Sequence, residues 1–255
     1  KEKKEQREKE KGGTDNMMDA ALRTLLCEKA SEFGVELSGE QVDKFDKYGD
    51  LLLSWNEKMN LTAIRDPEGV VIRHFIDSLS LLSVVPLQRE EKVIDVGTGA
   101  GFPGIPLLIA RPNVQLTLLD SLNKRLVFLQ EVLKELFLSA QTIHARAEEG
   151  GRQKALREQF DLATARAVAA LPVLCEYCLP FVKQGGYFVA MKGPDGYEEA
   201  KAAQHALLCL QAKLCRQVEL TLPDDSRRTL LVMEKTGHTP ATYPRAGAKM
   251  AKNPL

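Results

Sequence analysis

Apolar positions in the first third of the chain recur at helical spacing, over residues 18–85. Ser38 and Gln41 stand in the capping-box pattern that opens a helix. Asp66 followed by Pro67 predicts another helix start, because Asp caps helices and Pro is tolerated at their first position. We therefore expect an N-terminal helical region over these residues.

The pattern changes at Lys92 to short β-rich runs that alternate with helical segments. Such alternation predicts parallel strands with right-handed crossovers, hence a doubly wound, Rossmann-like α/β sheet over residues 86–237. The last two runs have no helix between them and predict an antiparallel pair. The predicted strands are 92–97, 115–120, 141–146, 160–167, 186–193, 215–223 and 228–236, and the predicted helices between them are 104–110, 123–137, 149–158, 172–182 and 197–213.

Both ends of the chain are rich in charge. Residues 1–17 are charge-dense and almost without apolar side chains, so we expect a disordered extension or tag. From Arg227 to the end there are six Lys or Arg and one acid, which predicts a basic tail over residues 238–255. This tail can face phosphate or can be a solvated, partly disordered segment. The sequence has no signal peptide and no apolar run of about 18 residues, so we expect a cytoplasmic protein without a membrane span.

The five cysteines do not predict a disulfide framework, because their number is odd. Cys175 and Cys178 form a C-x-x-C pair, and His205 and Cys209 follow at helical spacing. Zinc normally needs four such ligands, and all of these residues have apolar neighbours. We therefore expect buried cysteines and no metal.

The segment VIDVGTGAGFPG, residues 93–104, predicts a buried strand that ends in a glycine-rich turn. Glycines allow close approach of the backbone to a ligand at the carboxyl end of a strand. A dinucleotide fingerprint requires glycine where Phe102 stands, and Pro103 and Pro106 leave few free N–H groups for a pyrophosphate. The pattern therefore favours S-adenosylmethionine (SAM), which carries no phosphate, over NAD.

Acidic residues accompany this turn. Asp95 could hold the ammonium group of SAM, and Asp120 at the end of the second strand could accept the ribose hydroxyls. Structural roles remain open for both, with Asp95 as a loop cap and Asp120 as a helix cap. After the third strand, Ala147 and its neighbours would meet the adenine, and Phe102 would cover the ligand from the other side.

The chain resembles a known family, the bacterial 16S ribosomal RNA guanine-N7 methyltransferases (RsmG, formerly glucose-inhibited division protein B). The resemblance runs from about Leu51 to Leu255. The residues that carry it are Trp55, Asn56, Asn60–Thr62, Arg73, His74, Asp77–Leu79, Asp95–Pro106, Leu119–Ser121, Lys124, Arg125, Arg146–Glu148, Ala165–Ala167, Lys192, Gly193 and Tyr243–Arg245.

The resemblance implies SAM as methyl donor and guanine 527 in the 530 loop of 16S RNA as acceptor, with the free RNA or the 30S subunit as partner. It implies cofactor contacts at Asp95, Gly97, Gly99, Phe102, Asp120, Ser121, Ala147, Glu148 and Arg166. We expect Arg166, His74 and Asn60 to position the substrate, and Arg73, Lys192, Arg245, Lys249 and Lys252 to contact RNA. We expect a monomer.

Guanine N7 carries a lone pair and no proton, so its methylation needs alignment rather than a general base. Accordingly, we expect no catalytic triad. The sequence leaves other roles open for individual residues. Arg166 can form a structural ion pair, His74 can serve only in packing, and Lys192 and the tail can be solvated charge. Three other functions also stay open, namely a SAM methyltransferase for another RNA, a small molecule or a protein, a nicotinamide-dependent oxidoreductase, and a non-catalytic RNA-binding module of the same fold.

Overall fold

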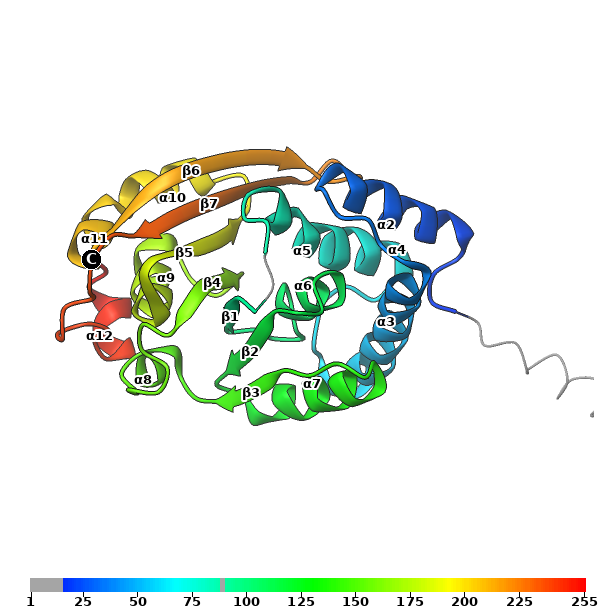
Figure 1. The fold of residues 1–255 in the computed structure, drawn as a ribbon, viewed down its shortest axis with the longest axis horizontal. Helices are drawn as coiled ribbons and strands as arrows, with labels where there is room; N and C mark the ends of the chain where they lie inside the picture. Colours follow the sequence, from blue (N-terminus) through cyan, green and yellow to red (C-terminus); the bar gives the residue numbers. More distant parts are fainter. Residues whose placement is uncertain (1–15, 88–89) are drawn as a thin grey trace, which may run out of the picture.

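The computed structural model describes residues 16–87 and 90–255, and its fold is a single sheet covered by helices (Figure 1). The N-terminal region contains α2 (Ala20–Glu32), α3 (Gly39–Met59), α4 (Pro67–Val70), a π-helical segment η1 (Val71–Ile76), α5 (Asp77–Leu79) and a short 3-10 segment η2 (Ser80–Ser83). The predicted capping box is present, because Ser38 and Gln41 each bond the other's backbone N–H. Asp66 caps α4 through a bond from the Gly69 N–H.

The seven predicted strands form one sheet in the order β3-β2-β1-β4-β5-β7-β6. Their bounds are β1 Lys92–Val96, β2 Gln115–Asp120, β3 Gln141–His144, β4 Phe160–Arg166, β5 Val182–Lys192, β6 Ala212–Thr221 and β7 Arg227–Lys235. Strands β1 to β5 pair in parallel, whereas β7 runs antiparallel to both β5 and β6. The predicted α/β fold and its antiparallel final pair are therefore confirmed.

Alternate residues of each strand enter two hydrophobic cores, one on each face of the sheet. Val93 packs with the N-terminal helices, α6 (Gly104–Ala110) and α7 (Asn123–Glu135), whereas its neighbour Ile94 packs on the other face. That second face is covered by α9 (Leu171–Cys178), the 3-10 segment η3 (Leu179–Phe181), α10 (Gly196–Ala202) and α11 (Gln204–Cys209). The N-terminal helices are thus part of the main core, and they hold one side of the strand ends in place.

Three predicted elements differ from the structure. The helix expected over residues 149–158 is only the short α8 (Ala147–Gly150), followed by turns. The helix expected over 197–213 breaks at Ala203 into α10 and α11, and its last residues start β6. The tail is ordered: it forms α12 (Gly247–Lys252), with Met250 fully buried.

The prediction of a disordered extension lies mostly on residues 1–15, outside the described residues. Met17 is an exception, because it is buried and its side chain fills the space beside Gly49. Within the described residues no helix is both long and apolar enough to cross a membrane.

Candidate functional site

The glycine-rich turn after β1 adopts a conformation that glycine alone takes easily. Gly97, Gly99 and Gly101 all have positive φ, of 70°, 62° and 101°. At Gly101 a side chain would also collide, since a Cβ would lie 2.6 Å from the Tyr48 hydroxyl. Gly97 N–H donates to the carbonyl of Leu119 across 2.8 Å, so the turn is joined to the end of β2.

Asp95 holds this turn in place through side-chain hydrogen bonds. Its Oδ2 accepts hydrogen bonds from Thr98 Oγ1 (2.7 Å) and Gly104 N (2.9 Å), and the residue is fully buried. Burial raises the pKa of Asp95 to about 6. The side chain does not line the cavity described next, so the structure supports the loop-capping alternative over the expected ammonium contact.

A cavity of about 270 Å³ opens beside the turn, at the carboxyl ends of β1 to β4. It brings together five of the residues predicted to bind the cofactor, namely Gly97, Asp120, Ser121, Ala147 and Glu148, and adds the unpredicted residues Arg125, Arg146, Val168 and Tyr177. We call it the cofactor cavity. Gly99 is not among the residues that line it.

Asp120 in this cavity is 1% exposed and already bonded. Its Oδ1 accepts from Leu122 N (2.9 Å), and its Oδ2 accepts from Gly99 N (2.9 Å) and from Arg125 (3.2 Å). A carboxylate has about four acceptor positions, so about one remains for a further donor. Asp120 thus steadies the glycine turn and the start of α7 and retains acceptor capacity.

Phe102, which was predicted to cover the ligand, does not line the cofactor cavity. Its ring is 5% exposed and stacks on His74 at 4.3 Å between centroids, with Tyr48 at 5.3 Å. The Arg166 guanidinium lies 5.1 Å from the ring centroid. Phe102 is therefore the apolar support for His74 and Arg166, because the N-terminal helices pack over this end of the turn.

A second cavity, of about 380 Å³, lies on the other side of β4. We call it the acceptor cavity. Ala167 lines both cavities and follows Arg166 with a positive φ of 56°. The acceptor cavity is lined by the predicted residues Arg73, His74, Arg166 and Lys192, together with Ile64, Asp77, Ala167, Met191, Gly193, Glu199 and Arg228.

Arg166 connects the elements around the acceptor cavity. Its guanidinium donates to Asp77 Oδ2 (2.9 Å), to His74 Nδ1 (3.1 Å) and to the carbonyl of Arg73 (3.0 Å). Arg228 Nε lies 3.2 Å from the other Asp77 oxygen, an ion pair without hydrogen-bond geometry. Arg166 was also predicted to bind the cofactor, but it lines only the acceptor cavity.

His74 is neutral. Burial lowers its pKa from 6.5 to about 3, and the nearby Arg166 charge acts in the same direction. Since an arginine can only donate, Nδ1 must accept and the proton resides on Nε2, which lies 2.8 Å from Thr62 Oγ1. Both ring nitrogens are thus occupied, and the imidazole is a fixed link rather than an available base.

The loop that receives His74 is held by Asn56, which is buried and was not among the predicted site residues. Its side chain bonds the N–H and C=O of Thr62, each across 2.9 Å. Asn60, which we expected to position substrate, is instead the exposed left-handed cap of α3 and does not line the acceptor cavity. The helical periodicity of α3 places Asn56 on the buried face, so the sequence pattern could have identified this residue.

Arg73 and His74 lie on the π-helical segment Val71–Ile76. An inserted π turn re-aims side chains within a helix and is frequent at functional sites. Arg73 therefore extends outward and pairs with Asp224 across 2.6 Å. Although burial opposes it, hydrogen bonds from Ser226 and Arg73 lower the pKa of Asp224 to about 2.

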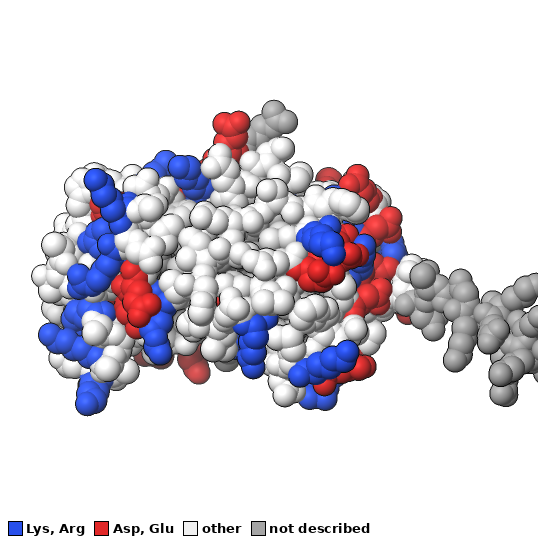
Figure 2. Space-filling view, turned by 90° about the horizontal axis from the view of Figure 1, so that it is seen from below, with Lys and Arg blue, Asp and Glu red and all other residues white. Residues whose placement is uncertain are grey.

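The other residues predicted to contact RNA, besides Arg73, fall into two groups. Lys192 is only 10% exposed and bonds Glu199 and the carbonyl of Ala169, each across 2.8 Å. Arg245 is likewise 10% exposed and pairs with the buried Glu176. Both side chains thus pair with carboxylates of the protein itself, and Lys192 also lines the acceptor cavity. Lys249 and Lys252 are exposed on α12, and among the described residues neither has an ion-pair partner. Figure 2 shows Lys and Arg side chains gathered at the end of the molecule that carries α8 and α12.

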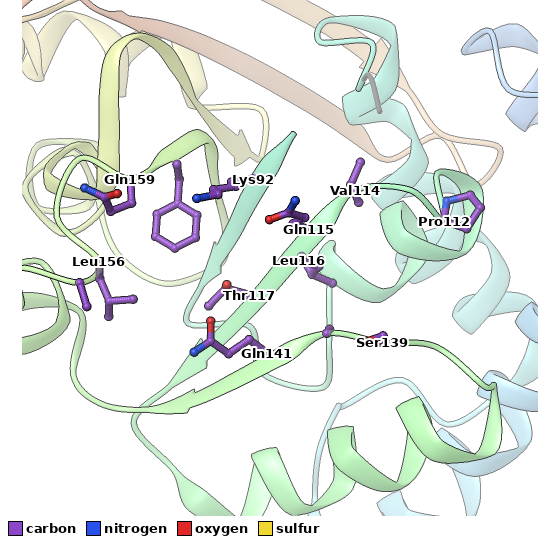
Figure 3. A pocket seen from close by; sticks show the side chains of 13 residues that line it. Lys92, Pro112, Val114, Gln115, Leu116, Thr117, Ser139, Gln141, Leu156 and Gln159 are labelled. Carbon is purple, nitrogen blue, oxygen red and sulfur yellow. The ribbon is translucent and has the colours of Figure 1, made fainter. Parts of the chain in front are cut away.

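A larger cavity, about 470 Å³, lies at the opposite edge of the sheet (Figure 3). Its walls include Lys92, Gln115 and Gln141, the first residues of β1, β2 and β3. Ligands of open α/β sheets bind at the carboxyl ends of the strands. The position of a cavity at the carboxyl ends of the strands, rather than its volume, therefore identifies the candidate site.

Two of the five cysteines are buried as expected, whereas Cys27 and Cys209 are half-buried and Cys215 is exposed. Cys175 and Cys178 are fully buried, and burial raises the pKa of the Cys175 thiol well above its usual range. His205 lies 3.5 Å from the Cys209 sulfur. Among residues 16–87 and 90–255, no group of three or more His, Cys, Asp or Glu is arranged to hold a metal ion.

Comparison with known proteins decides the family. Residues 41–228 match the GidB family model, described as rRNA small subunit methyltransferase G. The chain belongs to this family. It is 52% identical over 236 residues to "Ribosomal RNA small subunit methyltransferase G" of Acetivibrio thermocellus, covering 92% of this chain and 97% of that one. The protein of the same name from Alkaliphilus oremlandii is 49% identical over 236 residues, covering 92% and 99%.

Other solved structures share the fold of this methyltransferase G family member. The crystal structure of TrmN from Thermus thermophilus matches with a TM-score of 0.50 and 17% identity. The match covers 65% of this chain and 53% of that one. At this identity the similarity supports the α/β fold alone, in agreement with the sheet order described above.

Proposed function

We propose that this protein transfers the methyl group of SAM to N7 of a guanine in small-subunit ribosomal RNA. One observation carries the proposal: the cofactor and acceptor cavities adjoin at Ala167, on the carboxyl edge of β4. A donor in one cavity and a base in the other would meet at this residue. Membership of the methyltransferase G family supports methylation of small-subunit ribosomal RNA.

The residues of the cofactor cavity fit SAM. Asp120 has about one acceptor position left for a ribose hydroxyl, and Ala147 and Glu148 line the same cavity, where we expect the adenine. The glycine turn presents backbone without side chains beside them. When bound, SAM supplies a methyl group on a sulfonium, which an unprotonated ring nitrogen can attack.

The chemistry of the acceptor cavity favours N7 over a hydroxyl or an amine. Methylation of those groups requires removal of a proton, whereas N7 has none. His74 is neutral, but both of its ring nitrogens are already hydrogen-bonded, one to Arg166 and the other to Thr62. His74 therefore offers alignment rather than base catalysis, and alignment is what N7 methylation needs.

Guanine recognition would come from the charged groups of the acceptor cavity. Arginine or lysine suits guanine O6, so Arg166 and Lys192 are the candidates there. A carboxylate suits the N1 and N2 hydrogens, and Glu199 lines the cavity with one oxygen held by Lys192 and by Leu171 N. We assign the target to guanine 527 in the 530 loop of 16S RNA, on the basis of the family resemblance.

Transfer of labelled methyl to small-subunit RNA from a strain that lacks the modification tests the proposal. Free RNA and assembled 30S subunits are both offered, and the product nucleoside is identified by mass spectrometry. We expect 7-methylguanosine in at least one substrate. A protein that binds SAM yet labels no guanine N7 would contradict the proposal, and labelling of another RNA or of a small molecule would redirect it.

A further inference from the structure

The last part of the chain forms a strap over the helices beside the cofactor cavity. The strap is residues Thr239–Lys252, and Figure 1 shows its helix α12 beside α8. Arg157 donates to the carbonyls of Thr239 (2.8 Å), Pro240 (3.2 Å) and Tyr243 (2.9 Å). The strap is therefore fixed along its length to the turn region that follows α8.

Arg245 joins the strap to α9. Its guanidinium bonds both oxygens of Glu176, with the closest contact at 2.7 Å, and its backbone N–H donates to Glu176 across 2.6 Å. Glu176 is fully buried. The next residue, Tyr177, lines the cofactor cavity, so this ion pair fixes the part of α9 that forms the wall.

Gly247 joins the strap to α8. A Cβ at this position would lie 2.5 Å from Glu148 Oε1 and 3.3 Å from Glu148 Cδ. Its φ is not in the left-handed region, so the backbone does not require glycine here. A side chain here would instead displace the Glu148 carboxylate, which is the end of a flexible side chain. Glu148 thus approaches α12 at Gly247 and also lines the cofactor cavity.

We propose that the strap sets the affinity for the cofactor, with Gly247 and Arg245 as positioning residues that act through Glu148 and Glu176. The inference rests on the proposed use of this cavity for SAM. A free glutamate side chain has many rotamers, and holding it in one before binding removes that entropic penalty. The strap therefore prepares the cavity wall, although none of its residues touches the cavity.

The variant Gly247→Ala tests this with one methyl group. The added Cβ must displace the Glu148 carboxylate, whereas alanine favours the helix, so α12 should stay folded. We expect SAM binding, measured by titration calorimetry, to weaken about five- to tenfold. In turnover, KM for SAM should rise and kcat at saturating SAM should stay unchanged.

Gly39→Ala is the matched control, because Gly39 is also the first residue of a helix and a Cβ there meets nothing within 4 Å. It should bind SAM like the wild type. Thermal unfolding of all variants separates lost affinity from lost folding.

A double-mutant cycle with Glu148→Ala shows whether the effect passes through this carboxylate. Adding Gly247→Ala to Glu148→Ala should cause no further loss of SAM affinity. Equal SAM affinity of Gly247→Ala and the wild type would overturn the strap inference while leaving the function intact. A wild type that binds no SAM would instead overturn the proposed function.

Discussion

Arg166 donates a hydrogen bond to Nδ1 of His74 across 3.1 Å, and this contact fixes the imidazole proton on Nε2. The same guanidinium bonds Asp77 from α5 and the carbonyl of Arg73. One side chain at the end of β4 thereby ties the N-terminal helices to the sheet. The acceptor cavity exists as a defined shape because of this link.

Replacing Arg166 by lysine should remove most of the transfer activity. A lysine keeps the charge but cannot reach three partners in fixed directions. We expect kcat to fall about 100-fold, the loss typical of removing one positioned donor. Because Arg166 does not line the cofactor cavity, SAM affinity should stay within about twofold of the wild type. Wild-type turnover would remove Arg166 from the acceptor site.

The neutral state of His74 predicts a pH dependence of stability. Burial, with the Arg166 charge, lowers its pKa from 6.5 to about 3. Between these values the unfolded chain binds a proton that the folded protein does not, so stability falls as the pH drops below 6.5. The slope due to His74 reaches at most about 1.4 kcal/mol per pH unit. Denaturant unfolding of the wild type and His74→Gln, from neutral pH to about pH 5, measures it.

Other groups titrate in the same range, so the comparison between the two proteins is essential. Burial raises the pKa of Asp95 to about 6, which makes stability fall as the pH rises from 3.8 toward 6. Both proteins contain Asp95, and the difference between them isolates His74. Parallel pH profiles of the two proteins would show that His74 is not held neutral.

Phe102→Leu separates the two cavities. The ring supports His74 and Arg166 but does not line the cofactor cavity. Leucine keeps most of the apolar volume, so we expect a loss in stability of about 1 kcal/mol. SAM affinity should be unchanged and transfer reduced, because His74 loses its stacking partner. Weakened SAM binding with normal transfer at saturation would restore the original prediction for Phe102.

Arg245 and the two lysines of α12 should behave differently, although all three were predicted to bind RNA. Arg245→Ala leaves the buried Glu176 without its partner, and we expect a loss of about 3 kcal/mol in unfolding free energy. Lys249→Ala and Lys252→Ala should leave stability unchanged and each reduce the salt slope of RNA binding by about 1. RNA affinity that is insensitive to both lysines would remove α12 from the interface.

Much of the fold followed from the sequence because its determinants are local. The strand periodicity, the glycine turn of residues 97–101 and the capping residues Ser38 and Asp66 each act over a few positions. The helix expected over 149–158 is shorter than the sequence predicts, because tertiary contacts to the strap hold this region as turns.

The sequence predicted which residues belong to the site better than it predicted how they are arranged. Asp120, Ala147 and Arg166 were found by their positions at or after strand ends and His74 by the family resemblance, and all four line the two cavities. The inward turn of Phe102 could not be predicted from the sequence, because it depends on packing against helices distant in the chain. The same holds for Arg245, whose buried partner lies sixty-nine residues away.

The central claim is that the acceptor atom is N7 of guanine. The most direct test is small-subunit RNA that carries 7-deazaguanosine at the position labelled by the wild-type reaction, introduced by ligation. This replacement exchanges N7 for C–H and keeps O6 and the Watson–Crick edge. We predict that the RNA still binds and competes with unmodified RNA but accepts no methyl group. Methyl transfer to the 7-deazaguanosine RNA would contradict the account.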